Sequence, residues 1–328
     1  KIRNRRVPPT LNDVSESADG APRSAAAAWA RDLTVTYRQT RALDGLNISI
    51  NTGRLTCVLG PNGAGKSTTF AVLAGLAQPT SGSAELLGRI PGSAGARDRL
   101  GVMLQEGGVS TGATGSAVVR HIAALREAPQ TASHWIETLG IAAMGRTTFR
   151  RMSGGQKKRV ALACALVGHP QMVLVDEPTA GLDPPGRRLV WEILTTLRDQ
   201  GVTVVMNTHD LAEAERLADD IVILEKGRCV LSSSLDAALA TVDESVDFDA
   251  PLHLDVGSLE AALTFGSQVE ERSPGQYRIV GDVSPQTLAT VTAWCSQHGV
   301  TPRALRIGSA RLEDLYWDMV NDASKDPR

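Results

Sequence analysis

Residues 60–68 restrict the possible folds of this chain more than any other segment. They fit the pattern G-x-x-x-x-G-K-[ST], with the sequence Gly60, Pro61, Asn62, Gly63, Ala64, Gly65, Lys66, Ser67 and Thr68. A short, mostly apolar run (Leu55–Leu59) precedes them, and a helix-like stretch follows. Glycines let the backbone curl so that successive N–H groups point at a phosphate chain, and the helix adds the positive end of its dipole. The segment therefore predicts a phosphate-binding loop between a buried strand and a helix.

Two side chains of this loop suit the outer phosphates and a cation. Lys66 places a positive charge near the phosphates, and the Ser67 hydroxyl can complete the octahedron of a magnesium ion. An acidic partner for the metal follows the apolar run Met172–Val175, which ends in Asp176 and Glu177. Neighbouring residues of an extended chain point in opposite directions. We therefore expect Asp176 on the metal side and Glu177 facing an attacking water as general base.

A second phosphate-binding element precedes the helix-like stretch 157–167. It consists of Ser153, Gly154, Gly155 and Gln156, and it begins 23 residues before Asp176. Serine is a good helix N-cap, and paired glycines expose backbone N–H groups at the positive end of the helix. One nucleotide does not need two phosphate sites in one chain, so this element separates the chain from simpler phosphate-loop proteins.

Strand and helix patterns alternate over much of the chain, which predicts a mostly parallel sheet with helices packed around it. Between about residues 106 and 168 the strand pattern gives way to helical pieces, which we interpret as a helical subdomain. The strand candidates are 33–37, 46–50, 55–59, 99–104, 172–175, 202–206 and 221–224, and the helix candidates are 117–126, 133–139, 187–198 and 211–218.

The length of 328 residues suggests about two domains. Residues 1–28 have the composition of a flexible N-terminal arm. An acidic, turn-rich stretch around 241–250 predicts a boundary after residue 240, followed by a C-terminal accessory domain over 245–328. In that domain the patterns predict strands at 252–256 and 276–280, helices at 258–265 and 285–297, and an apolar helical stripe over 312–319.

Composition narrows the class of protein further. The chain has 34 basic and 36 acidic residues, a formal net charge of −2, which argues against a nucleic-acid binder. No run approaches the roughly 18–20 apolar residues of a membrane span, so we expect any membrane role to require another chain. The four cysteines form no CxxC pair and are expected to be reduced packing residues.

In this order, the motifs resemble the ATP-binding-cassette (ABC) ATPases over roughly residues 29–240. The resemblance implies a P-loop α/β cassette, with a mostly parallel sheet, antiparallel strands and a helical subdomain, beside a small α+β C-terminal domain. In that family two cassettes dimerise head to tail, and each ATP lies between the phosphate loop of one and the SGGQ element of the other. ATP and Mg²⁺ are thus the implied cofactors, and a second cassette is an implied partner, with a homodimer favoured over a heterodimer. Met152 stands where the family most often has Leu.

The resemblance also implies roles for individual residues. Tyr37 would stack on adenine, Gln105 would touch the metal and water, and Asp183 would link the two sites of the dimer. Ser153 and Gly155 would contact the γ-phosphate across the dimer, while His209 would hold it and orient water. The implied catalytic residues are Glu177 and His209; the metal ligands are Ser67, Gln105 and Asp176; the nucleotide contacts are Tyr37, Gly60, Pro61, Asn62, Gly63, Ala64, Gly65, Lys66, Ser67, Thr68, Gln105, Ser153, Gly154, Gly155, Gln156 and Asp183.

Within the family, the spacing of the motifs and the residues around them distinguish between functions. Lys66 and Glu177 are 111 positions apart, which leaves no room for the long coiled coil of DNA-repair relatives. The single phosphate loop is unlike the two of translation-associated members. The segments 102–106, 111–115 and 181–184 are similar to bacterial antibiotic and multidrug exporters. This implies an ATP-hydrolysing subunit that powers export of a drug, antibiotic or lipid-like substrate through a separate permease, on the cytoplasmic face of the membrane.

Two alternatives stay open at this point, an importer ATPase subunit and a non-transport ABC ATPase. The resemblance implies that an importer of this kind would carry a regulatory or substrate-sensing β-barrel as its C-terminal domain. The helix-rich pattern after residue 251 favours the exporter.

Overall fold

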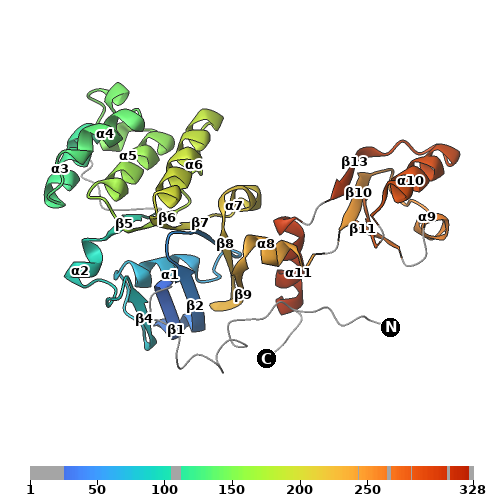
Figure 1. Ribbon diagram of the computed structural model, residues 1–328, viewed down its shortest axis with the longest axis horizontal. Helices are drawn as coiled ribbons and strands as arrows, with labels where there is room; N and C mark the ends of the chain where they lie inside the picture. Colours follow the sequence, from blue (N-terminus) through green and yellow to red (C-terminus); the bar gives the residue numbers. More distant parts are fainter. Residues whose placement is uncertain are drawn as a thin grey trace. The chain divides into compact units, whose positions relative to one another are not determined.

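The computed structural model describes residues 26–104, 112–242, 244–263, 267–281, 283–308 and 311–324. They form two compact units: the first contains the described residues up to Leu235 together with Met319–Ser324, and the second contains Asp236–Asp318, so the boundaries fall within the helices α8 (Leu235–Leu239) and α11 (Leu312–Ser324). Figure 1 gives the labels of the helices and strands in both units. Within the described ranges, no helix has the length and apolarity that a membrane span requires.

A six-stranded sheet forms the centre of the first unit. Its order is β5-β6-β7-β3-β8-β9, and all neighbours are parallel except the last pair. Every residue of β3, β6 and β7 is buried, as expected of central strands covered on both faces. The strands are β3 (Leu55–Leu59), β5 (Leu100–Met103), β6 (Met172–Asp176), β7 (Thr203–Asn207), β8 (Asp220–Glu225) and β9 (Arg228–Ser234). Because β3, β6 and β7 are parallel, the loops after them meet at one edge of the sheet.

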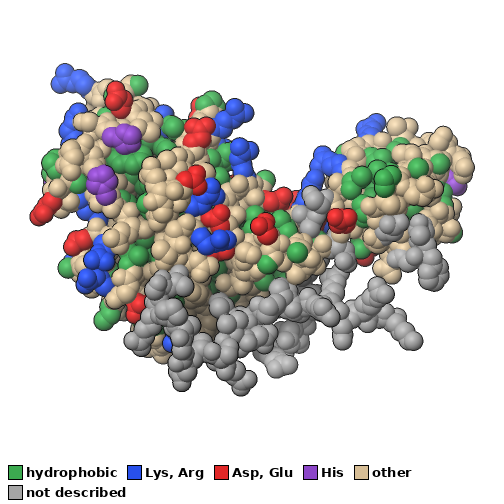
Figure 2. Space-filling view, in the orientation of Figure 1, with side chains coloured by type: hydrophobic (Ala, Val, Ile, Leu, Met, Phe, Trp, Pro, Cys, Tyr) green, Lys and Arg blue, Asp and Glu red, His purple; other side chains and the backbone are tan. Residues whose placement is uncertain are grey.

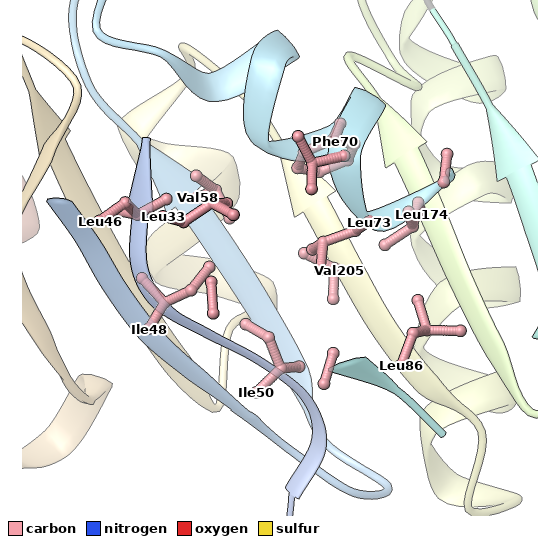
Figure 3. Packing of buried hydrophobic residues seen from close by; sticks show 14 of the residues in the cluster. Leu33, Leu46, Ile48, Ile50, Val58, Phe70, Leu73, Leu86, Leu174 and Val205 are labelled. Atoms are coloured by element: carbon pink, nitrogen blue, oxygen red, sulfur yellow. The ribbon is translucent and has the colours of Figure 1, made fainter. Parts of the chain in front are cut away.

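A second sheet, with the order β2-β1-β4, is antiparallel and packs near helix α1 (Lys66–Leu73). Its strands are β1 (Ala26–Tyr37), β2 (Thr40–Asn51) and β4 (Ser81–Leu86). Figure 3 shows Phe70 and Leu73 of α1 among apolar side chains from both sheets, and both residues are buried. Truncating Phe70 to Ala is expected to cost about 3–5 kcal/mol of stability. This core fixes α1, and with it the loop that precedes α1.

The start of β1 corrects one expectation. Residues 26–28, which the sequence pattern assigns to the N-terminal arm, belong to this strand, and Ala27 and Ala28 are buried. Alanine has a low preference for strands. Here it is held by pairing on both sides, with Asn51 and Ile50 of β2 and with Leu86 of β4.

The helical part of the first unit lies between β5 and β6 in sequence. It contains α3 (Gly115–Leu125), α4 (Thr131–Thr138), α5 (Gly154–Leu166) and two 3₁₀ turns, Ala142–Met144 and Phe149–Arg151. Three further helices of this unit are α2 (Ala94–Arg97), α6 (Pro184–Asp199) and α7 (Leu211–Leu217). A side chain at Gly115 would meet Val160 at 2.8 Å, which shows how closely α3 and α5 approach.

The second unit is a four-stranded antiparallel sheet with helices, so it is α+β rather than all strand. The sheet order is β11-β12-β10-β13. Its elements are β10 (Ser245–Asp249), α9 (Val256–Ala262), β11 (Gln268–Ser273), β12 (Gln276–Val280), α10 (Pro285–Gln297), β13 (Arg303–Gly308) and the part of α11 (Leu312–Ser324) up to Asp318. The expected strand 276–280 and helix 285–297 are present with those bounds.

Other expectations for this unit are wrong. There is no strand over 252–256; the strand is β10, taken from the acidic stretch that suggested a boundary. Its Asp247 accepts two hydrogen bonds from Arg278 of β12, at 2.5 and 3.0 Å, so the acid is paired across the sheet. Asp314 of α11 in turn accepts from Arg272 and Arg278, each at 2.7 Å. The strands β11 and β13 had not been predicted.

Candidate active site

The glycine-rich loop between β3 and α1 depends on backbone conformations that favour glycine. The φ angles are 149° at Gly60, 82° at Gly63 and 104° at Gly65. A Cβ at Gly60 would lie 2.3 Å from the carbonyl oxygen of Leu224, and one at Gly65 would lie 2.7 Å from Cδ2 of Leu43. Gly63 instead has open space around it. The loop is therefore tightly seated on the protein on one side and accessible on the other, as a phosphate cradle requires.

Two other segments hold this loop through backbone contacts. The Gly227 N–H, in the turn between β8 and β9, donates to the Ala64 carbonyl at 3.0 Å, and the Asp44 N–H donates to the Gly227 carbonyl at 3.0 Å. The carbonyl oxygen of Ala42 would be 2.8 Å from a Cβ at either Gly65 or Gly227. Strand β2 thus passes between two glycines that leave it no spare space.

Lys66 lies at the base of the loop with its side chain largely buried. Its Nζ donates to the carbonyl oxygens of Gly60 at 2.6 Å and Pro61 at 3.0 Å. Burial lowers the pKa of Lys66, whereas the charges of Glu177 and Asp176 act in the opposite direction. The predicted cation and the two predicted carboxylates therefore share one electrostatic environment.

Asp176 ends β6 and is 4% exposed. Its Oδ1 accepts a hydrogen bond from Nδ2 of Asn207 at 2.5 Å. Burial is the largest influence on its pKa, which lies above the ordinary value despite this bond and the nearby Lys158 and Lys66. An ionised carboxylate that has lost its hydration is unfavourable by itself, and a divalent cation would offset that cost. The exposed Ser67 hydroxyl and this carboxylate are oxygen donors of the kind Mg²⁺ takes, so the residues present fit that ion.

Asn207 is a residue that the sequence reasoning missed. It ends β7, is 3% exposed, and its Oδ1 has no hydrogen-bond partner among the described residues. Exchanging Oδ1 and Nδ2 of this amide would place its oxygen against the Asp176 carboxylate, and the two oxygens would repel each other. The amide nitrogen of Asn207 is therefore assigned to the side of Asp176. A polar residue directly after an apolar strand, two positions before His209, is the signal that could have identified it.

The burial of Asp176 leads to a stability prediction. The pKa of Asp176 is higher in the folded chain than its ordinary value, so ionisation of this carboxyl lowers the free energy of unfolding. This loss of stability is absent below about pH 4 and grows as the pH rises through the pKa of the folded chain. We expect Asp176→Asn, without nucleotide or Mg²⁺, to raise the melting temperature by a few degrees at pH 7 and not at pH 3.5. The measurement is differential scanning calorimetry at both pH values, with the exposed Asp98→Asn as the matched control. A lower melting temperature at pH 7 would contradict the burial argument.

Glu177 directly follows β6 and has an unusual backbone. Its φ is 47°, in the left-handed region that non-glycine residues rarely adopt. Its N–H donates to the Asn207 carbonyl at 2.9 Å, and its carbonyl accepts from Nζ of Lys158 on α5. Both backbone groups are therefore held in this strained conformation, as is common at functional sites. These two backbone hydrogen bonds therefore fix the position from which the Glu177 side chain extends.

The structure brings the two predicted catalytic residues together. Nδ1 of His209, in the loop after β7, lies 3.0 Å from Oε1 of Glu177. The imidazole is 67% exposed, whereas the Glu177 side chain is 21% exposed. A carboxylate and an imidazole that reach solvent beside the phosphate loop can accept a proton from water and contact a phosphate oxygen.

The SGGQ element begins α5 with a capping box. Ser153 Oγ accepts from the Gln156 N–H at 3.2 Å, and Gln156 Oε1 accepts from the Ser153 N–H at 3.0 Å. Gly154 has open space around it, whereas a Cβ at Gly155 would lie 3.0 Å from Cδ2 of Leu182. The glycine that faces outward is thus available to a ligand, and the one that faces inward packs on the loop before Asp183.

The remaining predicted residues are placed as follows. Asp183 caps α6, since its Oδ1 accepts from the Gly186 N–H at 3.2 Å. Tyr37 ends β1 and is 50% exposed, which leaves ring surface accessible for stacking. Asn62 is exposed, and Thr68 is partly buried on the first turn of α1. Gln105 lies outside the described residues.

The chain is similar to known proteins both in sequence and in fold. Residues 43–180 match the family described as ABC transporter. The chain is 34% identical over 221 residues to the daunorubicin/doxorubicin resistance ATP-binding protein DrrA of Streptomyces peucetius, covering 65% of this chain and 67% of that protein. It is 30% identical over 302 residues to the Nod factor export ATP-binding protein I of Ralstonia nicotianae, covering 90% and 94%. A solved dimeric ATP-binding cassette bound to ADP and Pi superposes with a TM-score of 0.59 at 25% identity, covering 63% of this chain and 98% of that one.

Proposed function

The chain belongs to the ABC transporter family, and we propose that it is the ATP-hydrolysing subunit of an exporter that moves a drug, antibiotic or lipid-like substrate through a separate membrane permease. The observation that carries this proposal is the 3.0 Å contact between Glu177 and His209, at the sheet edge that also presents Lys66 and Asp176. A protein that only sensed nucleotide would not need a proton acceptor there. The two relatives described above are named for drug resistance and for Nod factor export, which supports export as the direction.

The proposed reaction follows from the positions of these groups. The loop N–H groups and Lys66 bind the β- and γ-phosphates of ATP, with Lys66 moving its ammonium from backbone carbonyls to phosphate oxygens. Ser67, Asp176 and Gln105 would hold Mg²⁺, which would neutralise charge on the phosphate oxygens. Glu177 accepts a proton from the water whose oxygen attacks the γ-phosphorus, and His209 orients that water and the γ-phosphate. The bond to the β-phosphate oxygen breaks, leaving ADP and phosphate.

The site is proposed to be completed by a second cassette, most simply another copy of this chain. Ser153 and Gly155 lie at the capped start of α5, and the N-terminal end of a helix suits the γ-phosphate held by the partner. ATP would then hold two cassettes together, and loss of the γ-phosphate would let them separate. The relative that was solved as a dimer with ADP and Pi is consistent with this cycle.

A basic hollow on the helical part is the proposed contact for the permease. It has a volume of about 640 Å³ and is lined by Gly112, Arg146, Thr147, Thr148, Arg150 and Arg151. No Asp or Glu occurs from residue 138 to 175, so the positive charge there has no acidic neighbour in sequence. Figure 2 shows that this helical region carries Lys and Arg side chains together with Asp, Glu and His on the face in view. An acidic cytoplasmic segment of a membrane chain would complement it, which would place the subunit at the cytoplasmic face of the membrane.

The experiment that tests this proposal uses the tagged chain expressed in its own cells. We expect it to purify from detergent-solubilised membranes with a polytopic membrane chain, and inside-out vesicles that contain the pair to accumulate doxorubicin or a fluorescent lipid when ATP is added. The triple variant Arg146→Ala, Arg150→Ala, Arg151→Ala is expected to lose at least fivefold of the co-purifying chain. A matched triple variant at exposed Arg89, Arg97 and Arg120 is the control.

The outcomes separate the function from the docking surface. Recovery of the wild-type chain solely with ribosomes or DNA would remove the transport proposal. Normal recovery of the permease with the triple arginine variant would leave transport in place and exclude the hollow as its contact.

A further inference from the structure

Glu213 is a buried carboxylate that the proposed reaction does not use. It lies on α7, is 2% exposed, and both of its oxygens accept a hydrogen bond. Nε1 of Trp191 donates to Oε1 at 2.7 Å, and Oγ1 of Thr208 donates to Oε2 at 2.7 Å. Buried carboxylates persist where donors replace their lost water, so these two bonds define the place of the side chain.

Thr208 connects this carboxylate to the loop that carries His209. Its hydroxyl has one hydrogen, which goes to Glu213, and a lone pair accepts the Asp210 N–H at 3.1 Å. Asp210 Oδ1 in turn accepts the Glu213 N–H at 3.1 Å and caps α7. The residues on both sides of His209 are therefore held, although its own ring is mostly exposed. The backbone on either side of His209 consequently sets how the ring meets Glu177.

The other end of the network is on α6, the helix that Asp183 caps. Trp191 of α6 donates to Glu213, and the Arg216 guanidinium of α7 lies 4.9 Å from the centre of the Trp191 ring. Arg187, one turn before Trp191, lies 3.8 Å from Asp210. Three side-chain contacts thus join α6 to α7 and to the residue that caps α7. They connect the helix that Asp183 caps with the loop that carries His209.

We propose that Trp191, Glu213 and Thr208 form a positioning network that holds His209 against Glu177 and couples it to the Asp183 end of α6. The proposal rests on the proposed function, because it assigns no contact with ATP to these three residues and acts through His209. In a head-to-tail dimer, a displacement of the loop at Asp183 would reach His209 through α6 and this network. Hydrolysis would then depend on the contact with the second copy through the position of His209, in addition to the γ-phosphate contact that the second copy supplies.

The test separates binding from turnover in the purified chain. Thr208→Val removes the hydroxyl and keeps the shape of the side chain, and Thr208→Ser restores the hydroxyl. We expect Thr208→Val to lower kcat at least tenfold while the affinity for a fluorescent ATP analogue changes less than twofold, and Thr208→Ser to retain at least half of wild-type kcat. Thr196→Val is the matched control, since the Thr196 hydroxyl bonds only its own helix, at the Glu192 carbonyl.

A spectroscopic measurement tests the network independently of activity. The indole N–H signal of Trp191, assigned from Trp191→Phe, is expected to be protected from solvent exchange and to move in Glu213→Gln. The ring signals of His209 are expected to shift in Thr208→Val and to stay in place in Thr196→Val. Trp191→Phe is also expected to reduce kcat at least threefold at unchanged affinity, which keeps the proposal testable if Thr208→Val does not fold.

Three results would decide against the proposal. Wild-type kcat in both Thr208→Val and Trp191→Phe would exclude a positioning role, and equal losses of affinity and kcat would indicate a merely structural one. Unmoved His209 signals in Thr208→Val would break the link to His209. Absence of hydrolysis in the wild-type chain at any concentration would instead refute the proposed function, while the NMR signals would still report on the network.

Discussion

Replacing Glu177 with Gln is expected to reduce ATP hydrolysis by about 10²–10⁴-fold, the usual contribution of a general base. ATP should stay bound, and two chains should stay together around it. In this structure the substitution changes the proton-accepting group and leaves the other contacts of residue 177 in place. The backbone groups of residue 177 keep their bonds to Asn207 and Lys158, and a carboxamide oxygen can still face His209. What is lost is the ability to take a proton from water.

Three measurements check this expectation: phosphate release, nucleotide retention after gel filtration, and the molar mass of the complex by light scattering. Glu192→Gln is the matched control, because Glu192 lies exposed on α6 away from these contacts. It should hydrolyse ATP at the wild-type rate. Rapid turnover in Glu177→Gln would overturn the assignment of the general base.

Replacing Ser153 with Arg is expected to abolish hydrolysis while leaving most of the nucleotide affinity that depends on Lys66. Ser153 caps α5 and lies on a different element from the loop that binds the phosphates. A long cation at this helix end would displace the γ-phosphate contact proposed across the dimer. Loss of the cap itself costs about 1 kcal/mol, which a folded cassette tolerates.

Ser153→Asn separates the two effects of that substitution. Asparagine is an effective N-cap, so this variant keeps the helix start and adds no charge. We expect it to retain at least a tenth of wild-type hydrolysis, whereas Ser153→Arg falls below detection. The affinity of both for a fluorescent ATP analogue is measured in parallel. An equal loss of affinity in Ser153→Arg would count against a site shared between two chains.

The parts of the molecule that could be predicted are those where the backbone dictates the residue. Gly60 and Gly65 could be predicted from the sequence because their φ angles favour glycine and there is no space for a Cβ at either position. Likewise, β3 and β6 are short apolar runs because both faces of the sheet are covered. The resemblance then supplied roles that no spacing could, including that of His209.

The parts that could not be predicted depend on partners distant in sequence. Asp247 is an acid inside a strand because Arg278, 31 residues later, bonds to it across the sheet. Asn207 and Glu213 look like isolated polar residues until the fold brings Asp176 and Trp191 to them. For the same reason Ala28 has the sequence character of an arm, because its pairing with Ile50 on one side and Leu86 on the other, rather than intrinsic preference, makes it part of a strand.

The contact of Gly65 and Gly227 with the Ala42 carbonyl has a mechanical consequence. Three stretches of main chain approach one another there, and the side chain of Leu43 packs beside them, so that neither glycine has room for a Cβ. Main chain in van der Waals contact deforms little, because close-packed interiors have low compressibility. We therefore expect the phosphate-binding loop to deform little, and a strain that ATP imposes on it to be transmitted to the two hairpins that contact it. Larger displacements during the ATPase cycle are consequently expected outside the phosphate-binding loop.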